Sequence, residues 1–411
     1  MIMFQKQKSF NLVYVMYLYW ALLISWQIFR TSSNRSIVDI SVKFLILAIL
    51  IFSTLKIQIS IPVKNLIIFI LFAYYMIFSL LVKEPAITVN SIITYCFPTI
   101  LTYLFYVHGY NYKVSKEVYI KYLNLIIITV LVMAVYSIIF DFDKFINALK
   151  ISNAYGNELS SFLISNHEYA LYLFLGLISC MFCYQFSSDT QFKKRYLYII
   201  AMIVFAINLV LTYSRTALLG FVVMLVTYIF IGNNNTVKKY IIACSIIGVL
   251  VLIFSPSLQE YVMKVVLKEN TDAGRLEMWN YGMTLFKDSP FFEKLTGYGY
   301  TAISQNLANY YQHQSFHNAY IQVLLQYGVI GFIFFTGLIV STVINGIKTF
   351  RDNRFVGAMF LSMSISAIVY MLTNTTVFML STSDSFMFTI FFAVIPLYVK
   401  NAIISKDFSA S

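Results

Sequence analysis

The chain has 411 residues, of which 60% are hydrophobic and 11% charged, and its mean hydropathy is +0.77. A soluble domain has about 45–50% apolar and about 25% charged residues, so this composition excludes a soluble globular protein. It predicts an all-α, polytopic membrane protein, because only helices and closed barrels satisfy their backbone groups in lipid.

Apolar runs of roughly 16 to 25 residues, long enough to cross a bilayer as helices, recur along the whole chain. The first of them is expected to stay in the protein as a helix, because no small-residue cleavage site follows it. About twelve transmembrane helices are predicted, at 10–29, 40–55, 65–82, 86–107, 122–140, 168–186, 196–213, 216–231, 240–255, 318–345, 355–372 and 384–399.

The basic residues predict the orientation of these helices. If the N-terminus is cytoplasmic, 17 of the 29 basic residues lie in inside loops, and only six lie in the short outside loops. The positive-inside rule therefore puts both termini in the cytoplasm. The net charge of +12 is mostly this topological signal, so no nucleic-acid partner is expected.

The chain reads as one polytopic domain, residues 1–411, with one long extracytoplasmic loop at 256–317, between the ninth and tenth helices. This loop is nearly neutral, so any anion that it binds must be held by single, well-placed residues. A second outside loop, at about 141–167, ends in the sequence "SNHEYA".

Arg215, in "TYSRTALLG", is predicted to lie at the outer boundary, where one helix ends and the next begins, directly after Tyr213 and Ser214. A charged residue at the membrane is costly unless it reaches the headgroups or finds a partner, so it indicates a functional site by default. The alternative is an arginine that reaches the lipid headgroups.

Arg275 and Trp279, in "GRLEMWNYGMTLFKDSP", are four residues apart and share one face of a predicted helix. We expect this helix to lie on the outer leaflet with Trp279 in the aromatic belt and Arg275 near the phosphates. The alternative for Arg275 is a salt bridge with Asp272 or Glu277. The expected apolar face consists of Leu276, Trp279, Met283 and Phe286.

Two of the four histidines, His313 and His317, precede the tenth helix, and Asn318 is the expected N-cap. A helix N-terminus favours anions, and histidine is the usual general base. His317 is therefore the candidate base. The alternative is an interfacial anchor, which is the favoured interpretation of His313.

Three further patterns carry weaker signals. Gly297 and Gly299, in "LTGYGYTAI", indicate a tight turn with close backbone approach. His313 and His317 have the spacing of zinc ligands, but neither HExxH nor a third ligand accompanies them. Asp141 and Asp143 form an isolated acidic pair. No metal site and no cofactor are predicted.

In their order, "SRTALLG", "GRLEMW", "KDSPFFEKLTGYGYTAI" and "HNAYIQVLLQYGVIGFIFF" resemble the bacterial O-antigen ligase and polymerase superfamily over about 160–345. The resemblance implies a membrane glycosyltransferase that acts on undecaprenyl-pyrophosphate-linked glycans outside the cytoplasmic membrane, by metal-independent, inverting transfer. A repeat-unit polymerase is the favoured activity, with the lipid-linked donor and acceptor, membrane lipids and a chain-length regulator as partners.

The resemblance also assigns roles to residues. His317 would deprotonate the acceptor hydroxyl, while Arg215 and Arg275 would hold the donor pyrophosphate. Asn166 matches a segment that is usually rich in asparagine, and the neighbouring His167 and Glu168 have no assigned role.

Three alternatives remain. A ligase shares these motifs but has another acceptor. A lipid-linked glycan flippase would have similar size and helix number, but it should carry charges at mid-membrane and short loops throughout, whereas the polar residues here gather outside. A peptidoglycan glycosyltransferase of the shape and division family fits the HN and Arg-Trp patterns less well.

Overall fold

The computed structural model describes residues 63–103, 116–149, 158–163, 165–187, 192–232, 239, 274–311, 315–374 and 391–392. Every regular element in these residues is a helix, as the all-α prediction requires. The helices predicted at 10–29, 40–55 and 240–255, and most of 384–399, lie outside these residues.

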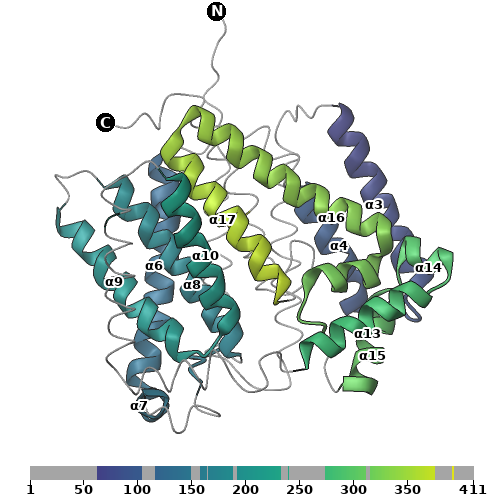
Figure 1. The fold of residues 1–411 in the computed structure, drawn as a ribbon, viewed down its shortest axis with the longest axis horizontal. Coiled ribbons are helices and arrows are strands. Elements are labelled where there is room, and N and C mark those ends of the chain that lie inside the picture. The colour runs from purple at the N-terminus through teal and green to yellow at the C-terminus, as the bar shows by residue number, and fades with distance from the viewer. Residues whose placement is uncertain are drawn as a thin grey trace, which may run out of the picture.

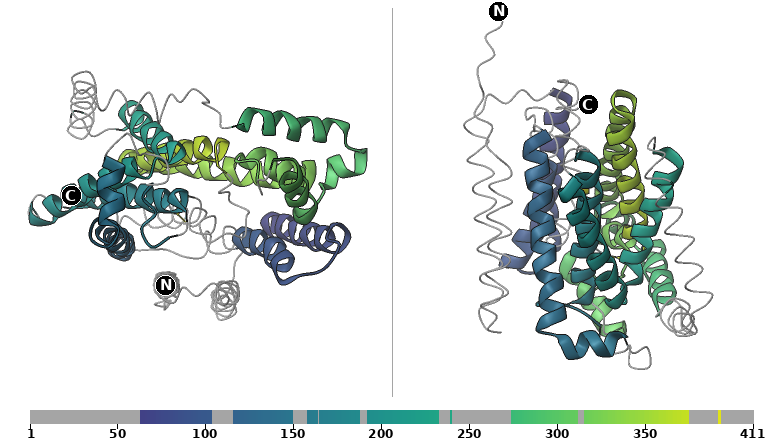
Figure 2. Two further views of the ribbon diagram at one scale, coloured as in Figure 1. Left: turned by 90° about the horizontal axis from the view of Figure 1, so that it is seen from below. Right: turned by 90° about the vertical axis from the view of Figure 1, so that its left-hand side faces the viewer.

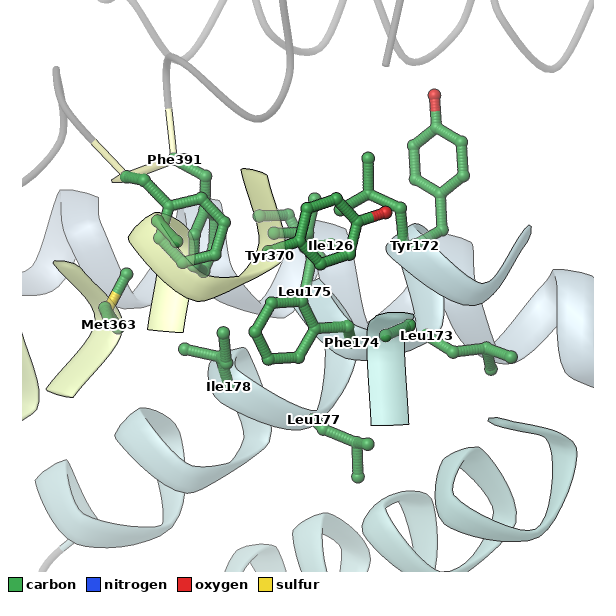
Figure 3. Close-up of a cluster of buried hydrophobic side chains, with 14 of the residues drawn as sticks. Ile126, Tyr172, Leu173, Phe174, Leu175, Leu177, Ile178, Met363, Tyr370 and Phe391 are labelled. Atoms are coloured by element: carbon green, nitrogen blue, oxygen red, sulfur yellow. The ribbon is translucent and has the colours of Figure 1, made fainter. Parts of the chain in front are cut away.

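One group of helices surrounds α8, whose side chains from Tyr169 to Cys183 are all buried. Phe174 of α8 stacks on Tyr370 of α17 with ring centroids 6.2 Å apart, in the core shown in Figure 3. A helix that is apolar all round is typical of a protein core or of a membrane span. The group consists of α6 (Lys116–Ile139), α8 (Asn166–Phe186), α9 (Phe192–Leu211), α10 (Arg215–Ile231) and α17 (Arg354–Leu372).

A second group lies on the other side of α17 (Figures 1 and 2). The long helix α16 packs against α17 of the first group and against α13, α14 and α15 of the second, so it joins the two. The second group consists of α3 (Val63–Lys83), α4 (Val89–Tyr103), α13 (Arg275–Asp288), α14 (Phe291–Thr296), α15 (Tyr300–Tyr311) and α16 (Ala319–Asp352).

Six helices of the described residues are long and apolar enough to cross a membrane, so the protein is a multi-pass membrane protein. The outward faces of these helices are apolar: Ile200, Ile203 and Ile207 of α9 are all exposed. Such a stripe would be unfavourable in water and suits contact with lipid. The six are α3, α6, α8, α9, α16 and α17.

The prediction of one continuous helix over 318–345 is wrong, because α16 breaks at Gly328, where φ is 62° and ψ is −170°. The break brings Gly328 against the end of α14, where a Cβ atom on it would lie 2.3 Å from the Leu295 carbonyl oxygen. The carbonyls of Leu325 and Gln326 instead accept hydrogen bonds from Tyr298 N (2.9 Å) and Gly299 N (3.0 Å). α16 therefore consists of a short first segment, 319–327, and a longer segment after Gly328.

The turn between α3 and α4 is bound to the N-terminus of α15 by the buried carboxylate of Glu84. Glu84 Oε1 accepts hydrogen bonds from Tyr95 Oη (2.8 Å) and Tyr300 N (2.9 Å), and Oε2 accepts one from Thr301 Oγ1 (2.5 Å). A carboxylate at a helix N-terminus interacts favourably with the helix dipole. This contact across more than 200 residues fixes α15 against the helical bundle.

Candidate active site

Arg215 begins α10 after a turn that has an unusual backbone conformation. Tyr213 has φ of 55°, which a residue with a side chain rarely adopts. The turn is held by α8, because Asn166 Nδ2 donates to the Thr212 carbonyl at 3.0 Å. The side chain of Ser214 is fully buried, and its Oγ lies 3.3 Å from His167 Nδ1. The predicted site residues Asn166, Tyr213, Ser214 and Arg215 thus lie together.

Arg275 begins α13 and reaches the end of α17. Its Nη1 donates to the Thr373 carbonyl at 3.2 Å, and Thr216 Oγ1 donates to the same oxygen at 3.2 Å. Because Thr216 directly follows Arg215, this shared carbonyl brings the first turns of α10 and α13 together. The two arginines, 60 residues apart in the sequence, therefore belong to one site.

The positive charges of the two arginines act on each other. Burial, and then the charge of Arg215, lower the pKa of the half-buried Arg275 guanidinium below its usual value. In addition, α10 and α13 both lack a hydrogen bond from the side chain of their N-cap residue, which is Ser214 in one and Gly274 in the other. Helix N-termini carry a partial positive charge. The site thus concentrates positive charge that a bound anion would stabilise.

His317 lies between two residues whose backbones are held firmly. The Phe316 carbonyl accepts a hydrogen bond from Trp279 Nε1 at 2.8 Å, and the Phe316 N–H donates to Gln322 Oε1 at 3.2 Å. On the other side, Asn318 Oδ1 caps α16 by accepting from Tyr320 N and Ile321 N. His317 itself is half-buried with φ of 48°. Such strain persists only where the surroundings impose it, and it is frequent at functional sites.

Trp279 links the backbone beside His317 to the helix that Arg275 begins. Because Trp279 lies one helical turn after Arg275 and binds the carbonyl just before His317, α13 positions both residues. The expectation that Trp279 and Phe286 face the lipid is therefore wrong: both pack against a core cluster that includes Met278 and Phe316. Their burial is explained by α15 and α16, which cover this side of α13.

The remaining predicted site residues are found elsewhere. Gly297 and Gly299 have φ of 77° and 85° and make the close backbone approach to α16 that the motif predicted. They bind α14 to α16 rather than contact the arginines. His313 lies outside the described residues.

Sequence reasoning missed two participants, His167 and the Thr373 carbonyl. A backbone oxygen leaves no sequence signal, so Thr373 could not have been found. His167 belongs to the "SNHEYA" stretch that ends the second outer loop, and the rarity of histidine in this chain was the available signal.

A comparison with known proteins bears on the same part of the chain. Residues 199–336 match the family model described as O-antigen ligase, a range that contains Arg215, Arg275 and His317. No curated protein matches the chain. The match of residues 199–336 supports the O-antigen ligase and polymerase superfamily for this part of the multi-pass membrane protein, and it suggests a membrane enzyme of the glycosyltransferase type.

Proposed function

We propose that the protein is a polysaccharide polymerase. It joins undecaprenyl-pyrophosphate-linked oligosaccharide repeat units on the outer face of the cytoplasmic membrane. The observation that carries this proposal is that Arg275 and Thr216, the residue after Arg215, donate to one carbonyl, while Trp279, one helical turn after Arg275, donates to the carbonyl just before His317. Two cations and one base are the set that this chemistry needs.

The two guanidinium groups are proposed to bind the diphosphate of the donor. Arginine offers planar, paired N–H donors that match phosphate oxygens and stay charged at any working pH. As the bond between the anomeric carbon and the diphosphate oxygen breaks, the electron pair leaves with the diphosphate. Cations already in place stabilise the charge that develops there, without any reorganisation during the reaction.

His317 is the proposed general base. A hydroxyl of the acceptor sugar attacks the anomeric carbon from the face opposite the diphosphate, and the hydroxyl proton passes to the imidazole. This single displacement inverts the anomeric configuration. The diphosphate is a good leaving group, so we assign no general acid, whereas the weakly nucleophilic hydroxyl gains from a base by about 10²–10⁴-fold.

The proposed side of the membrane follows from the distribution of basic residues. Lys348, Arg351 and Arg354 lie where α16 meets α17, at the end of the protein remote from Arg275 and Thr373 (Figure 1). The positive-inside rule assigns that end to the cytoplasm, which leaves the arginines and His317 outside. The undecaprenyl chain would enter from the lipid between helices, and a chain-length regulator is a further proposed partner.

A glycan ligase is the second candidate, because the matching family model carries that description. The surface glycan of a deletion strain, resolved on a gel, separates the candidates. Glycan limited to one repeat unit is the result expected of a missing polymerase. Full-length glycan that remains on its lipid carrier would identify a ligase, and lipid-linked units retained in the cytoplasm would identify a flippase.

Complementation of that strain tests the mechanism. We expect His317→Asn and Arg275→Ala to leave lipid-linked single repeat units and no long chains. Asparagine tolerates the positive φ at this position better than alanine, so the variant removes the base without adding backbone strain. Lys287→Ala, on the exposed face of the same helix α13, is the matched control and should restore the normal ladder. Normal ladders from His317→Asn would contradict the mechanism.

A further inference from the structure

His167 interacts with Ser214 and with the charges of both arginines but has no role in the proposed glycosyl transfer. We propose that His167 is a positioning residue for Arg215: its imidazole holds Ser214 and thereby fixes the first turn of α10. This proposal rests on the proposed function, since it concerns the binding of the same donor diphosphate.

The first turn of α8 forms a bracket around the turn that precedes Arg215. Asn166 binds the carbonyl of Thr212, and His167 binds the hydroxyl of Ser214, so both ends of the turn are attached to adjacent residues of one helix. The bracket is itself fixed, because Ser165 Oγ caps α8 by accepting a hydrogen bond from His167 N at 3.2 Å.

Ser214 is used in an unusual way. It occupies the N-cap position of α10, where a serine side chain normally accepts a hydrogen bond from the helix's own N–H groups. Here it makes no such bond, is fully buried, and lies within hydrogen-bonding distance of the imidazole. The side chain therefore connects α10 to α8 instead of closing α10.

The turn needs such a bracket because Tyr213, between the two held residues, is strained. Its φ of 55° costs of order 1–3 kcal/mol for a residue with a side chain, and it persists only when the surroundings impose it. The hydroxyl of Tyr213 donates to the Ala148 carbonyl of α7 (Phe142–Leu149), which adds a third attachment. Without the link from His167 to Ser214, the turn can relax and change the position of Arg215 relative to Arg275.

The charges nearby place His167 within the site rather than beside it. Electrostatic interactions connect the imidazole with Arg275 of α13, with Arg215 of α10 and with Glu158 of the segment before α8. A shift of Arg215 relative to Arg275 would weaken bidentate binding of a diphosphate, since a misplacement of about 1 Å can cost about 10²-fold.

Two substitutions separate positioning from direct contact. Asparagine places an amide where Nδ1 of the imidazole stands, so His167→Asn retains a partner for Ser214. Glutamine places its amide near Nε2, so His167→Gln retains only the far end of the ring. The readout is the affinity of the full chain in nanodiscs for a short-chain prenyl diphosphosugar, whose diester phosphates keep a constant charge across neutral pH.

We expect His167→Ala and His167→Gln to weaken binding by about tenfold and His167→Asn to restore it to within about twofold. In the Arg215→Ala background, His167→Ala should cause no further loss, because the histidine acts through the arginine. Ser214→Ala is a smaller change and should weaken binding of the probe as much as His167→Ala does. It tests the same link if His167→Ala does not fold. Unfolding temperatures close to that of the wild type show that each variant is folded.

The proposal is overturned if His167→Ala binds like the wild type, or if glutamine restores affinity and asparagine does not, since the ring would then contact the ligand through Nε2. Arg215→Ala and Arg275→Ala distinguish a failure of the proposed function from a failure of the role proposed for His167. If both bind the probe like the wild type, the proposed function fails as well. If both lose binding while His167→Ala keeps it, only the role of His167 is wrong.

Discussion

Two polar clusters lie at the same end of the molecule, and they differ in how their charge is balanced. In the Glu84 cluster, formed by Glu84, Tyr95, Tyr300 and Thr301, a buried carboxylate accepts hydrogen bonds from protein donors. In the arginine pair, Arg215 and Arg275, burial and then the charge of Arg215 lower the pKa of the Arg275 guanidinium. The first cluster joins protein groups alone, whereas we propose that the second binds an anion. We therefore interpret the first as a structural connection and the second as the proposed binding site.

The largest expected effect concerns the close packing of Gly328 against the end of α14. Gly328→Ala should prevent correct folding, because the new Cβ would lie 2.3 Å from the Leu295 carbonyl oxygen at a positive φ of 62°. Strain and overpacking together should cost about 3–5 kcal/mol, measured as lost yield and a lower unfolding temperature. Gly337→Ala, in the same helix with nothing within 4 Å of its Cβ, is the matched control and should be neutral.

Arg275→Ala should show the opposite pattern. Activity should fall by about 10²–10³-fold, the range seen when one preorganised donor to a developing charge is removed. Stability should change by less than about 1 kcal/mol, because relief of the repulsion from Arg215 offsets the lost hydrogen bond to Thr373. Turnover of a purified lipid-linked repeat unit and thermal unfolding measure the two quantities. A large loss of stability would instead make Arg275 a structural residue like Glu84.

Arg215→Lys tests whether a positive charge at this position is sufficient for activity. Lysine keeps the positive charge but loses the planar pair of donors, so activity should fall by about 10–100-fold in the same turnover assay. Lys83, which lies near Glu293 at 4.0 Å outside the arginine pair, offers the converse control. Lys83→Arg should leave turnover unchanged, and a fully active Arg215→Lys variant would show that bidentate binding is not used.

Glu84→Gln should have no effect on turnover and should act on stability alone. The amide nitrogen cannot accept the hydrogen bonds that one carboxylate oxygen now receives, which should cost about 1–3 kcal/mol in the free energy of unfolding. Turnover per folded molecule should stay the same. Glu117→Gln, at an exposed position of α6, is the control for loss of a carboxylate. Reduced turnover with unchanged stability would place Glu84 in the active site.

The sequence predicted the described membrane helices well, because their length and apolar character are local properties. It placed the start of α6 too late, at 122 instead of Lys116, since polar residues in the first turn were excluded from the apolar run. The break at Gly328 was not predictable, because its cause is the backbone of α14, about 30 residues earlier. Nothing in the local sequence distinguishes Gly328 from other glycines of α16.

The structure brings the first turns of α10 and α13, which begin at Arg215 and Arg275, to one carbonyl, but the sequence did not predict this connection. Arg215 was selected because a charge at the membrane is costly, and His317 because it precedes a helix N-terminus. The contact of Arg275 with Thr373 spans 98 residues, and that of His167 with Ser214 spans 47. Contacts between such distant segments depend on the packing of α8, α10, α13 and α17, which hydropathy does not specify.

The most direct test of the account is the shift in unfolding temperature that a short-chain prenyl diphosphosugar causes in the wild-type protein and in Arg275→Ala. A ligand that binds only the folded state stabilises it by an amount set by its affinity, about 2.7 kcal/mol at 100 times the dissociation constant. The account predicts a clear rise for the wild type, little or none for Arg275→Ala, and a smaller rise with the monophosphate analogue. Equal shifts in the two proteins would contradict the claim that the arginine pair binds the diphosphate.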